Sequence, residues 1–237
     1  GGFTTICSMP NTTPPIDNAG IVEFVKEKGR QADRARVLPI GCVSKGRQGK
    51  ELAELWELAQ AGVIAFSDDG SPVSDSNLMR QALSYSSALG LSVINHCEDL
   101  ALTAGAVVNE GWVSNRLGLV GWPGEAEEGM VARDIALADL TGGALHIAHV
   151  TTARSVELVR GAKERGLRVT AEVTPHHLVL SEEWVLGHSP LGSLETPVTV
   201  DSYDTSTKVN PPLRSRVDVE ALVAGLREGV IDAIATD

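Results

Sequence analysis

Short apolar runs alternate along the chain with longer segments in which apolar residues recur every three or four positions. Each run is short enough for one strand and rich in β-branched residues, whereas the longer segments have the spacing of an amphipathic helix. The apolar runs cover residues 3–9, 36–43, 62–67, 91–96, 144–150, 167–173 and 231–236. The helical segments cover residues 18–31, 50–62, 76–90, 125–143, 153–166 and 216–229. The pattern predicts strands that alternate with helices.

The ends of the helical segments carry residues that start and stop helices. Asp17 precedes the first segment and is expected to cap it. Glycines such as Gly62, Gly90 and Gly166 supply the left-handed turn that leads into the next strand. A strand, a helix and a further strand in this order form a right-handed crossover between parallel strands. We therefore expect an α/β fold with a parallel sheet of seven strands.

Polar residues recur where the predicted strands end. They occupy residues 9–12, 67–70, 95–99, 148–152, 174–177 and 235–237. Because barrel enzymes build their sites at the carboxyl ends of the strands, this recurrence favours a (β/α)8 TIM barrel. The alternative is an open doubly wound sheet, but no glycine-rich phosphate loop follows any of the strands. We expect residues 1–237 to form a single barrel domain.

The two ends of the chain fall inside this pattern. The sequence starts without methionine in a strand-like run and stops where the last strand ends. We expect an internal fragment, in which the barrel is incomplete because its first strand and its C-terminal segment are missing. Such a fragment is not expected to close the barrel or to be active alone.

Composition narrows the classes of partner. The net charge is −11, with 20 Lys and Arg against 31 Asp and Glu, which argues against nucleic acid or an anionic membrane as a partner. No apolar stretch is long enough to span a membrane. The three cysteines, Cys7, Cys42 and Cys97, are far apart and odd in number, so we expect reduced core cysteines in a cytoplasmic protein. Residues 187–208 form a long polar stretch, which we expect to be a lid or a surface loop.

Four residues are the candidates for a metal site. Asp69, His96 and His149 each end an apolar run, and Asp237 closes the last one. Two imidazoles and a carboxylate are a common zinc ligand set, and a metal would compensate a carboxylate at the end of a buried strand. The competing interpretation is four unrelated polar residues at strand ends. Asp68 lies next to Asp69, and alternation along a strand sends only one of the two toward the metal, so the other is expected to meet loop donors at the rim.

The remaining histidines are expected to be structural. His146 and His149 are three residues apart, so on a strand they face opposite ways, and His149 is nearer the catalytic end. His176 and His177 are adjacent and are therefore expected to face opposite ways as well. His176 or His177 could donate a hydrogen bond that supports the metal site, but a role in packing or hydrogen bonding within the fold is the favoured interpretation.

Two amides and one arginine are weaker candidates. Asn11 and Asn210 follow strand or loop ends, and an amide side chain offers both a donor and an acceptor to a planar substrate. Turn formation is the ordinary alternative for both. Arg214 either pairs with an anion or solvates a loop.

Taken together, these motifs resemble the dihydroorotases of the amidohydrolase superfamily, in the bacterial class that has an aspartate at the fourth strand. The resemblance keeps the motif order and rests on GGFTTICSMPNT, AFSDDGSPV, NHCED, GGALHIAHVTT, VNPPLR and IDAIATD. It implies a metal-dependent enzyme that reversibly hydrolyses the cyclic amide of (S)-dihydroorotate to N-carbamoyl-L-aspartate in pyrimidine biosynthesis. One or two zinc ions are the implied cofactor.

The resemblance also implies roles for individual residues. Asp69 is similar to the carboxylate that bridges two metals, and His96 and His149 are similar to ligands of one of them. Asp237 resembles the ligand that also acts as the catalytic base. Asn11 and Asn210 are similar to substrate contacts. The His-x-His pair and the nearby arginine of the family's first strand are absent from this sequence.

Two alternatives stay open. Hydantoinases and allantoinases are similar enzymes that bridge their metals with a carbamylated lysine, and residues 62–70 contain no lysine. The second alternative is a non-catalytic dihydroorotase-like subunit that supports an aspartate transcarbamoylase, but such a subunit is expected to have lost its metal ligands. A homodimer or an association with aspartate transcarbamoylase would suit the resemblance.

Overall fold

The computed structural model describes residues 2–187 and 202–237. Most of the polar stretch expected as a lid or surface loop lies outside the described residues. The chain divides into two compact units. The first comprises Gly1–Glu98, Arg133–Ala148 and Ala162–Val169, and the second Asp99–Ala132, His149–Gly161 and Thr170–Asp237. Whether residues 1–237 form one domain stays a prediction.

The strands of the first unit pair in parallel, as the alternation predicts. They are β1 (Thr5–Ser8), β2 (Arg36–Pro39), β3 (Ala65–Ser67), β4 (Ser92–Asn95) and β7 (Ala144–Ile147). β1 pairs with β2, β3 pairs with β4, and β4 pairs with β7. A parallel bridge from Gly41 to Phe66 connects the chain after β2 with β3. Each strand is shorter than the apolar run that predicted it.

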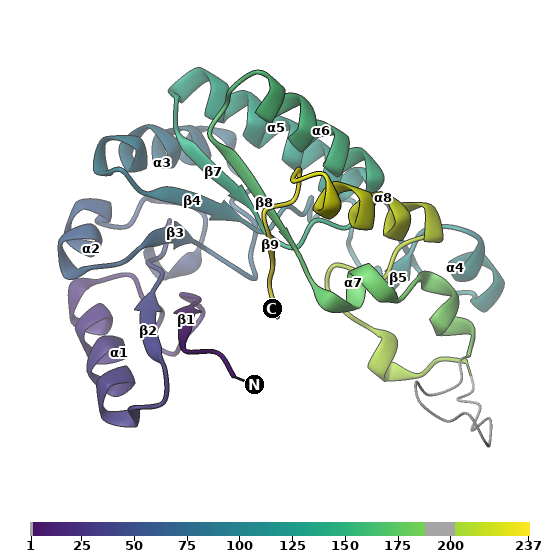
Figure 1. Ribbon diagram of the computed structural model, residues 1–237, viewed down its shortest axis with the longest axis horizontal. Helices are drawn as coiled ribbons and strands as arrows, with labels where there is room; N and C mark the ends of the chain where they lie inside the picture. The colour runs from purple at the N-terminus through teal and green to yellow at the C-terminus, as the bar shows by residue number, and fades with distance from the viewer. Residues whose placement is uncertain (1, 188–201) are drawn as a thin grey trace. The chain divides into compact units, whose positions relative to one another are not determined.

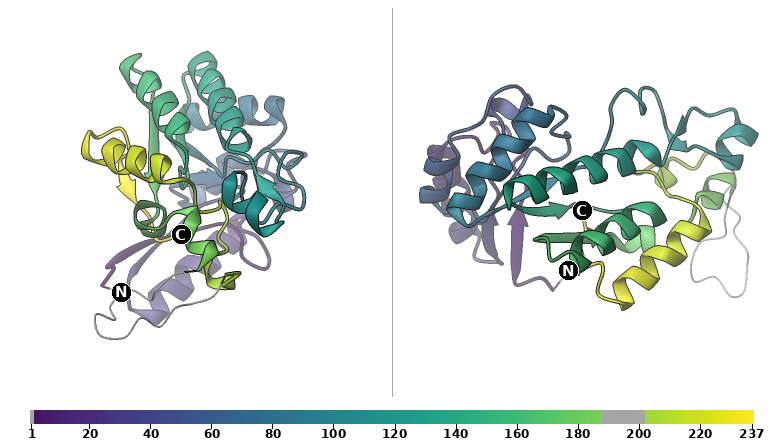
Figure 2. Two further views of the ribbon diagram at one scale, coloured as in Figure 1. Left: turned by 90° about the vertical axis from the view of Figure 1, so that its right-hand side faces the viewer. Right: turned by 90° about the horizontal axis from the view of Figure 1, so that it is seen from above.

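The helices of this unit begin and end at residues with clear physical roles. They are α1 (Ala19–Ala32), α2 (Leu55–Ala61), α3 (Ser76–Leu89) and a 3-10 turn at Lys45–Arg47. The side chain of Asn18, not Asp17, accepts the Ile21 N–H and caps α1, because Asn18 is the residue directly before the first helical turn. Gly62 and Gly90 adopt the left-handed conformation after α2 and α3, as expected. Figures 1 and 2 show α1 lying against β2.

The core of the first unit lies around its central strands. Phe66, Val93, Leu145 and Ile147 are almost completely buried. β1 differs, because it pairs only with β2 among the described residues and most of its side chains are exposed. Cys7 lies on β1 and is exposed, so its assignment to the core was wrong.

The other two cysteines match the expectation, since Cys42 and Cys97 are both buried. Burial raises the pKa of the Cys42 thiol to about 12. That thiol therefore stays protonated at neutral pH and serves as an apolar core group.

The second unit contains the parallel pair β8 (Val169–Val173) and β9 (Ala233–Ile234), together with most of the remaining helices. The helices are α4 (Trp112–Leu117), α5 (Glu125–Thr141), α6 (Ala153–Glu164), α7 (Pro175–Val179) and α8 (Arg216–Arg227), with 3-10 turns at Glu182–Leu186 and Thr205–Thr207. Parts of α5 and α6 belong to the first unit. Ser215 caps α8 in a reciprocal capping box with Asp218.

Several short elements of the second unit were not predicted. β5 (Val108–Asn109) and β6 (Gly121–Trp122) have two residues each, which is too short for a detectable period. They pair in parallel, and Val108, Val113 and Val185 form a small apolar core beside them. No helix of the described residues is long and apolar enough to cross a bilayer.

Helix α7 corrects one prediction from the sequence. Thr174 caps the helix and Pro175 occupies its first turn, so His176 and His177 are helical rather than extended. Their rings lie with centroids 4.3 Å apart. The expectation that the two side chains face opposite ways was therefore wrong, because strand alternation does not apply after the proline.

Candidate metal centre

The two carboxylates that follow β3 have different surroundings. Asp68 accepts hydrogen bonds from the backbone N–H groups of Val43 and Ser44, at 2.9 and 3.1 Å, and from the Ser44 hydroxyl. Burial raises the pKa of Asp68, and its bonds to Ser44 act in the opposite direction. Asp68 meets loop donors as predicted, although it is buried rather than at the rim. Its carboxylate ties the end of β3 to the loop that follows β2.

Asp69 faces the end of the neighbouring strand. Its carboxylate Oδ1 lies 3.8 Å from Nδ1 of His96, which follows β4 directly. Both side chains are buried. The backbone N–H of Asp69 donates to the Ser67 hydroxyl at 3.0 Å. The pairing of β3 with β4 thus brings together two residues that are far apart in sequence.

Glu98 is a component of this region that sequence reasoning missed. Its Oε2 lies 2.8 Å from Nε2 of His96, and both residues are buried. The two residues are separated by one position, so along an extended chain they share a side. That spacing is the signal in the sequence that could have identified the pair.

Asp134 is another buried carboxylate, and it supports the end of β4 next to His96. Asp134 accepts a hydrogen bond from the Asn95 amide at 2.6 Å, and Asn95 accepts the Val73 N–H at 3.1 Å. Arg133 pairs with Asp134 and donates to the carbonyls of Val73 and Ser74. Burial raises the pKa of Asp134, and Arg133 opposes that shift. This network fixes Asn95, the last residue of β4, to α5 and to the loop that follows β3.

His149 follows β7 in an unusual backbone conformation. Its φ is +33°, which is rare for a residue with a side chain, and the residue is buried. Glu127 holds the backbone just beyond it, by accepting the N–H groups of Thr151 and Thr152 at 3.0 and 3.2 Å and the Thr151 hydroxyl. Strained conformations of this kind concentrate at functional sites.

Arg214 is buried and contributes to the same network. Its Nε donates to the Thr151 hydroxyl at 3.0 Å, and its Nη1 donates to the Asn109 side chain and the Trp122 carbonyl, both at 2.8 Å. These acceptors are neutral and internal. The expectation that Arg214 solvates a loop was wrong, because its buried guanidinium joins the loop after β7 to β5 and β6. Its pairing with an anion stays a prediction.

Two of the four predicted metal residues, Asp69 and His96, form a buried pair within the first unit. His149 is buried too and belongs to the second unit, so its place beside this pair stays a prediction. Two atoms that each bind one ion at about 2.1 Å are at most about 4.2 Å apart, so the 3.8 Å between Asp69 and His96 fits a shared ion. A buried set of one carboxylate and two imidazoles also suits zinc chemically.

The other predicted site residues lie outside this pair. Asp237 is the last residue and is exposed, with a φ of +61°. Asn11 and Asn210 are exposed. Their roles stay predictions. His146 is half-buried and also lies outside this pair, in keeping with the structural role expected for it.

His177 has a structural role. Its Nε2 lies 3.0 Å from the Pro211 carbonyl and its Nδ1 lies 2.7 Å from the Thr174 hydroxyl. A carbonyl only accepts, so Nε2 carries the proton and Nδ1 accepts from the hydroxyl. Burial lowers the pKa of His177 to about 3. The pKa of His176 is also lowered by burial, and Asp237 opposes that shift.

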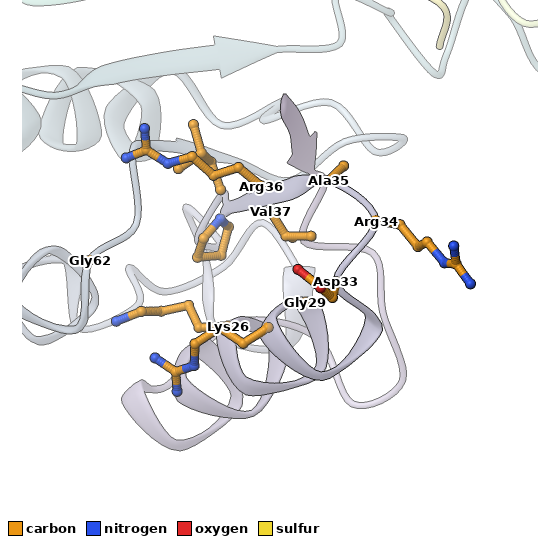
Figure 3. Close-up of a pocket in the computed structure, with 11 residues that line it drawn as sticks. Lys26, Gly29, Asp33, Arg34, Ala35, Arg36, Val37 and Gly62 are labelled. Carbon is orange, nitrogen blue, oxygen red and sulfur yellow. The ribbon is translucent and has the colours of Figure 1, made fainter. Parts of the chain in front are cut away.

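A surface hollow of about 600 Å³ lies elsewhere, between α1 and β2 (Figure 3). Lys26, Arg34 and Arg36 give its wall a positive charge. It forms where α1 ends and β2 begins, which is the amino end of the strand. Catalytic residues of barrel enzymes lie at the opposite end, so we assign no catalytic role to this hollow.

Solved structures with a similar fold include a hydantoinase and a dihydropyrimidinase. L-hydantoinase (dihydropyrimidinase) from Arthrobacter aurescens superposes with a TM-score of 0.74 at 22% identity, over 100% of this chain and 51% of that chain. Dihydropyrimidinase from Brevibacillus agri superposes with a TM-score of 0.72 at 23% identity, over 100% of this chain and 50% of that chain. At these identities the likeness establishes the fold alone, which is part of a TIM barrel, as the sequence predicts.

Relatives in sequence are much closer. A protein of Pelotomaculum thermopropionicum named dihydroorotase is 54% identical over 237 residues, which is 100% of this chain and 52% of the relative. A dihydroorotase of Thermoanaerobacter sp. is 50% identical over the same lengths. The chain therefore spans about half the length of these relatives. The profile of the family described as Dihydro-orotase-like matches residues 1–155, which include Asp69, His96 and His149. The chain belongs to the dihydroorotase-like family.

Proposed function

We propose that the protein carrying this chain is a dihydroorotase, which reversibly hydrolyses the cyclic amide of (S)-dihydroorotate to N-carbamoyl-L-aspartate. The observation that carries the proposal is the buried pair of Asp69 and His96 in a chain of this family, and we propose that His149 completes their metal site. The relatives that share about half of its residues are named dihydroorotases. The reaction needs only water as a co-reactant, since water adds across the ring C–N bond.

We propose zinc, as one or two ions, for the metal that these three residues hold. When bound, zinc polarises a carbonyl oxygen and lowers the pKa of a coordinated water toward neutrality. For this ion the protein would supply the buried carboxylate of Asp69 and the buried imidazoles of His96 and His149. Burial strengthens the electrostatic interactions of these groups, because little water screens them.

The remaining site residues are assigned by the same proposal. Asp237 takes the proton of the attacking water and delivers it to the ring nitrogen that leaves, which is the task of a general acid–base group. Asn11 and Asn210 orient the substrate through their amide groups. All three are exposed in the described residues, so they are open to a small molecule.

The absence of lysine from residues 62–70 favours dihydroorotase over the hydantoinase and allantoinase types. In those types a carbamylated lysine provides the bridging carboxylate, whereas Asp69 carries a carboxylate of its own. The metal-loaded protein should therefore be assayed with dihydroorotate, hydantoin and allantoin side by side. Of the three substrates, we expect fast turnover for dihydroorotate and slow or no turnover for hydantoin and allantoin. Faster turnover of hydantoin or allantoin would contradict the assignment.

The proposed reaction places the protein in pyrimidine biosynthesis in the cytoplasm. Cys42 and Cys97 support this location, because they are buried as expected for core cysteines of a reducing compartment. We keep the homodimer and the association with an aspartate transcarbamoylase as proposals. Size measurement of the purified protein, alone and mixed with the transcarbamoylase, tests them.

A further inference from the structure

The ring of His96 lies between two buried carboxylates. Nδ1 is 3.8 Å from Asp69 Oδ1, and Nε2 is 2.8 Å from Glu98 Oε2. The first distance is too long for a hydrogen bond, whereas the second is typical of one. The two carboxylates therefore interact differently with the same imidazole.

The short contact determines which ring nitrogen carries the proton. An ionised carboxylate can only accept a hydrogen bond, so Nε2 of His96 must donate to Glu98. In a neutral imidazole the other nitrogen then has a lone pair. For His96 that nitrogen is Nδ1, which faces Asp69. A histidine binds a metal through such a lone pair, while its other nitrogen is held by a hydrogen-bond acceptor.

We infer that Glu98 is a positioning residue, which fixes the ring and the tautomer of His96 so that Nδ1 is the metal-binding nitrogen. The inference rests on the proposed metal site and adds a residue that acts through His96 rather than on the substrate. It also assigns the atom through which His96 binds.

The neighbour of Glu98 in sequence has a separate task. Asp99 accepts the N–H of Ala101 at 2.9 Å and so caps the turn that follows. The local backbone thus has its own cap, and the Glu98 carboxylate is directed to His96 instead. Asp99 provides a matched control, because it is an adjacent acid with a purely local hydrogen bond.

Three substitutions separate the contributions of Glu98. Glu98→Gln keeps an acceptor oxygen but removes the charge, Glu98→Ala removes both, and Glu98→Asp keeps the charge on a shorter side chain. Asp99→Asn is the control. For each variant of the full-length protein, zinc affinity is measured by competition with a chromophoric chelator. The tautomer of His96 is read by 15N NMR on the metal-free, histidine-labelled protein.

The wild-type protein is expected to show the Nε2–H tautomer before zinc is added. Glu98→Ala should lose about 10–100-fold in zinc affinity, which is the usual effect of removing the carboxylate partner of a ligand, and should populate both tautomers. Glu98→Gln should lose less, Glu98→Asp should recover part of the loss, and Asp99→Asn should bind like wild type. Thermal melts check that every variant is folded.

Wild-type zinc affinity in Glu98→Ala, or an Nδ1–H tautomer in the wild-type protein, would overturn the inference. If Glu98→Ala lost an ion and excess zinc did not restore it, Glu98 would be a metal ligand. That result would also overturn the inference. If the wild-type protein bound no zinc, the proposed function would fail. The tautomer measurement would still decide the role of Glu98, because it needs no metal.

Discussion

At the scale of single residues, Asp68 and Asp69 show how neighbouring acids acquire separate tasks. Asp68 accepts two backbone N–H groups and a hydroxyl, so its charge is compensated within the protein. Asp69 instead faces His96 across 3.8 Å. Alternation along the chain predicted that the two would diverge. It could not identify Glu98, because a partner two positions away becomes visible only when the loop conformation is known.

Replacing Asp68 and Asp69 by alanine, one at a time, should separate a role in folding stability from a role in metal binding. Asp68→Ala leaves the buried donors of Ser44 unpaired, at about 1–3 kcal/mol for each, and should lower the free energy of unfolding. Asp69→Ala should abolish zinc binding and activity with a smaller effect on folding. Urea denaturation and metal analysis measure the two properties. The reverse pattern would exchange the roles of the two acids.

The buried His177 should make the protein sensitive to acid. Its pKa is about 3 when folded and about 6.5 when unfolded, so between these values only the unfolded state binds the proton. The free energy of unfolding should then fall by about 1.4 kcal/mol per pH unit as the pH decreases through this window. The charged or titratable groups His176, His149 and Arg214 all act to lower this pKa.

His177→Gln tests this dependence, because glutamine supplies a donor and an acceptor but does not titrate. Urea denaturation of both proteins between about pH 7 and pH 5 gives the two slopes. The variant should lose less stability on acidification than the wild type. Equal slopes would mean that His177 does not titrate differently on folding.

At the scale of elements, close packing of helices on strands limits which residues are tolerated. A Cβ atom built on Gly143, just before β7, would lie 2.9 Å from the backbone oxygen of Leu83 in α3. A backbone atom cannot move aside as a side chain can. Gly129 lies within α5 and has no atom within 4 Å of the corresponding position.

Alanine at these two glycines should have opposite effects on stability. Gly143→Ala should destabilise the protein by about 1–3 kcal/mol through overpacking. Gly129→Ala should stabilise it by about 0.5–1 kcal/mol, because alanine favours the helix. Thermal and urea denaturation measure both changes. A neutral Gly143→Ala would show that α3 packs less tightly on β7.

The sequence pattern located seven of the described strands and six of the described helices, because each of them lies within a longer apolar or amphipathic run of the sequence. Strand lengths were overestimated, since apolar residues continue into the turns at each end, as at Ile40 and Gly41 after β2. The two-residue strands β5 and β6 carry no period and were missed. Helix α7 was missed although Thr174 and Pro175 form a helix-start signal, because the adjacent histidines were interpreted as part of a strand.

At the scale of the whole molecule, the chain belongs to the dihydroorotase-like family and spans about half the length of its relatives. The candidate site was predictable in part, because each carboxyl-terminal strand end brings one polar residue to the same edge. Asp69, His96 and His149 came from that reasoning. The positions of Asp237, Asn11 and Asn210 relative to this group could not be derived, since they depend on loops and chain ends rather than on strand register.

The central claim is that Asp69, His96 and His149 hold a metal that the hydrolysis of dihydroorotate requires. The most direct test measures this reaction for the full-length protein after a chelator removes the metal and again after zinc is restored, beside Asp69→Asn. Activity should disappear with the metal, return with zinc, and stay absent in Asp69→Asn. Undiminished hydrolysis by the metal-free protein, or full zinc-dependent activity in Asp69→Asn, would contradict the account.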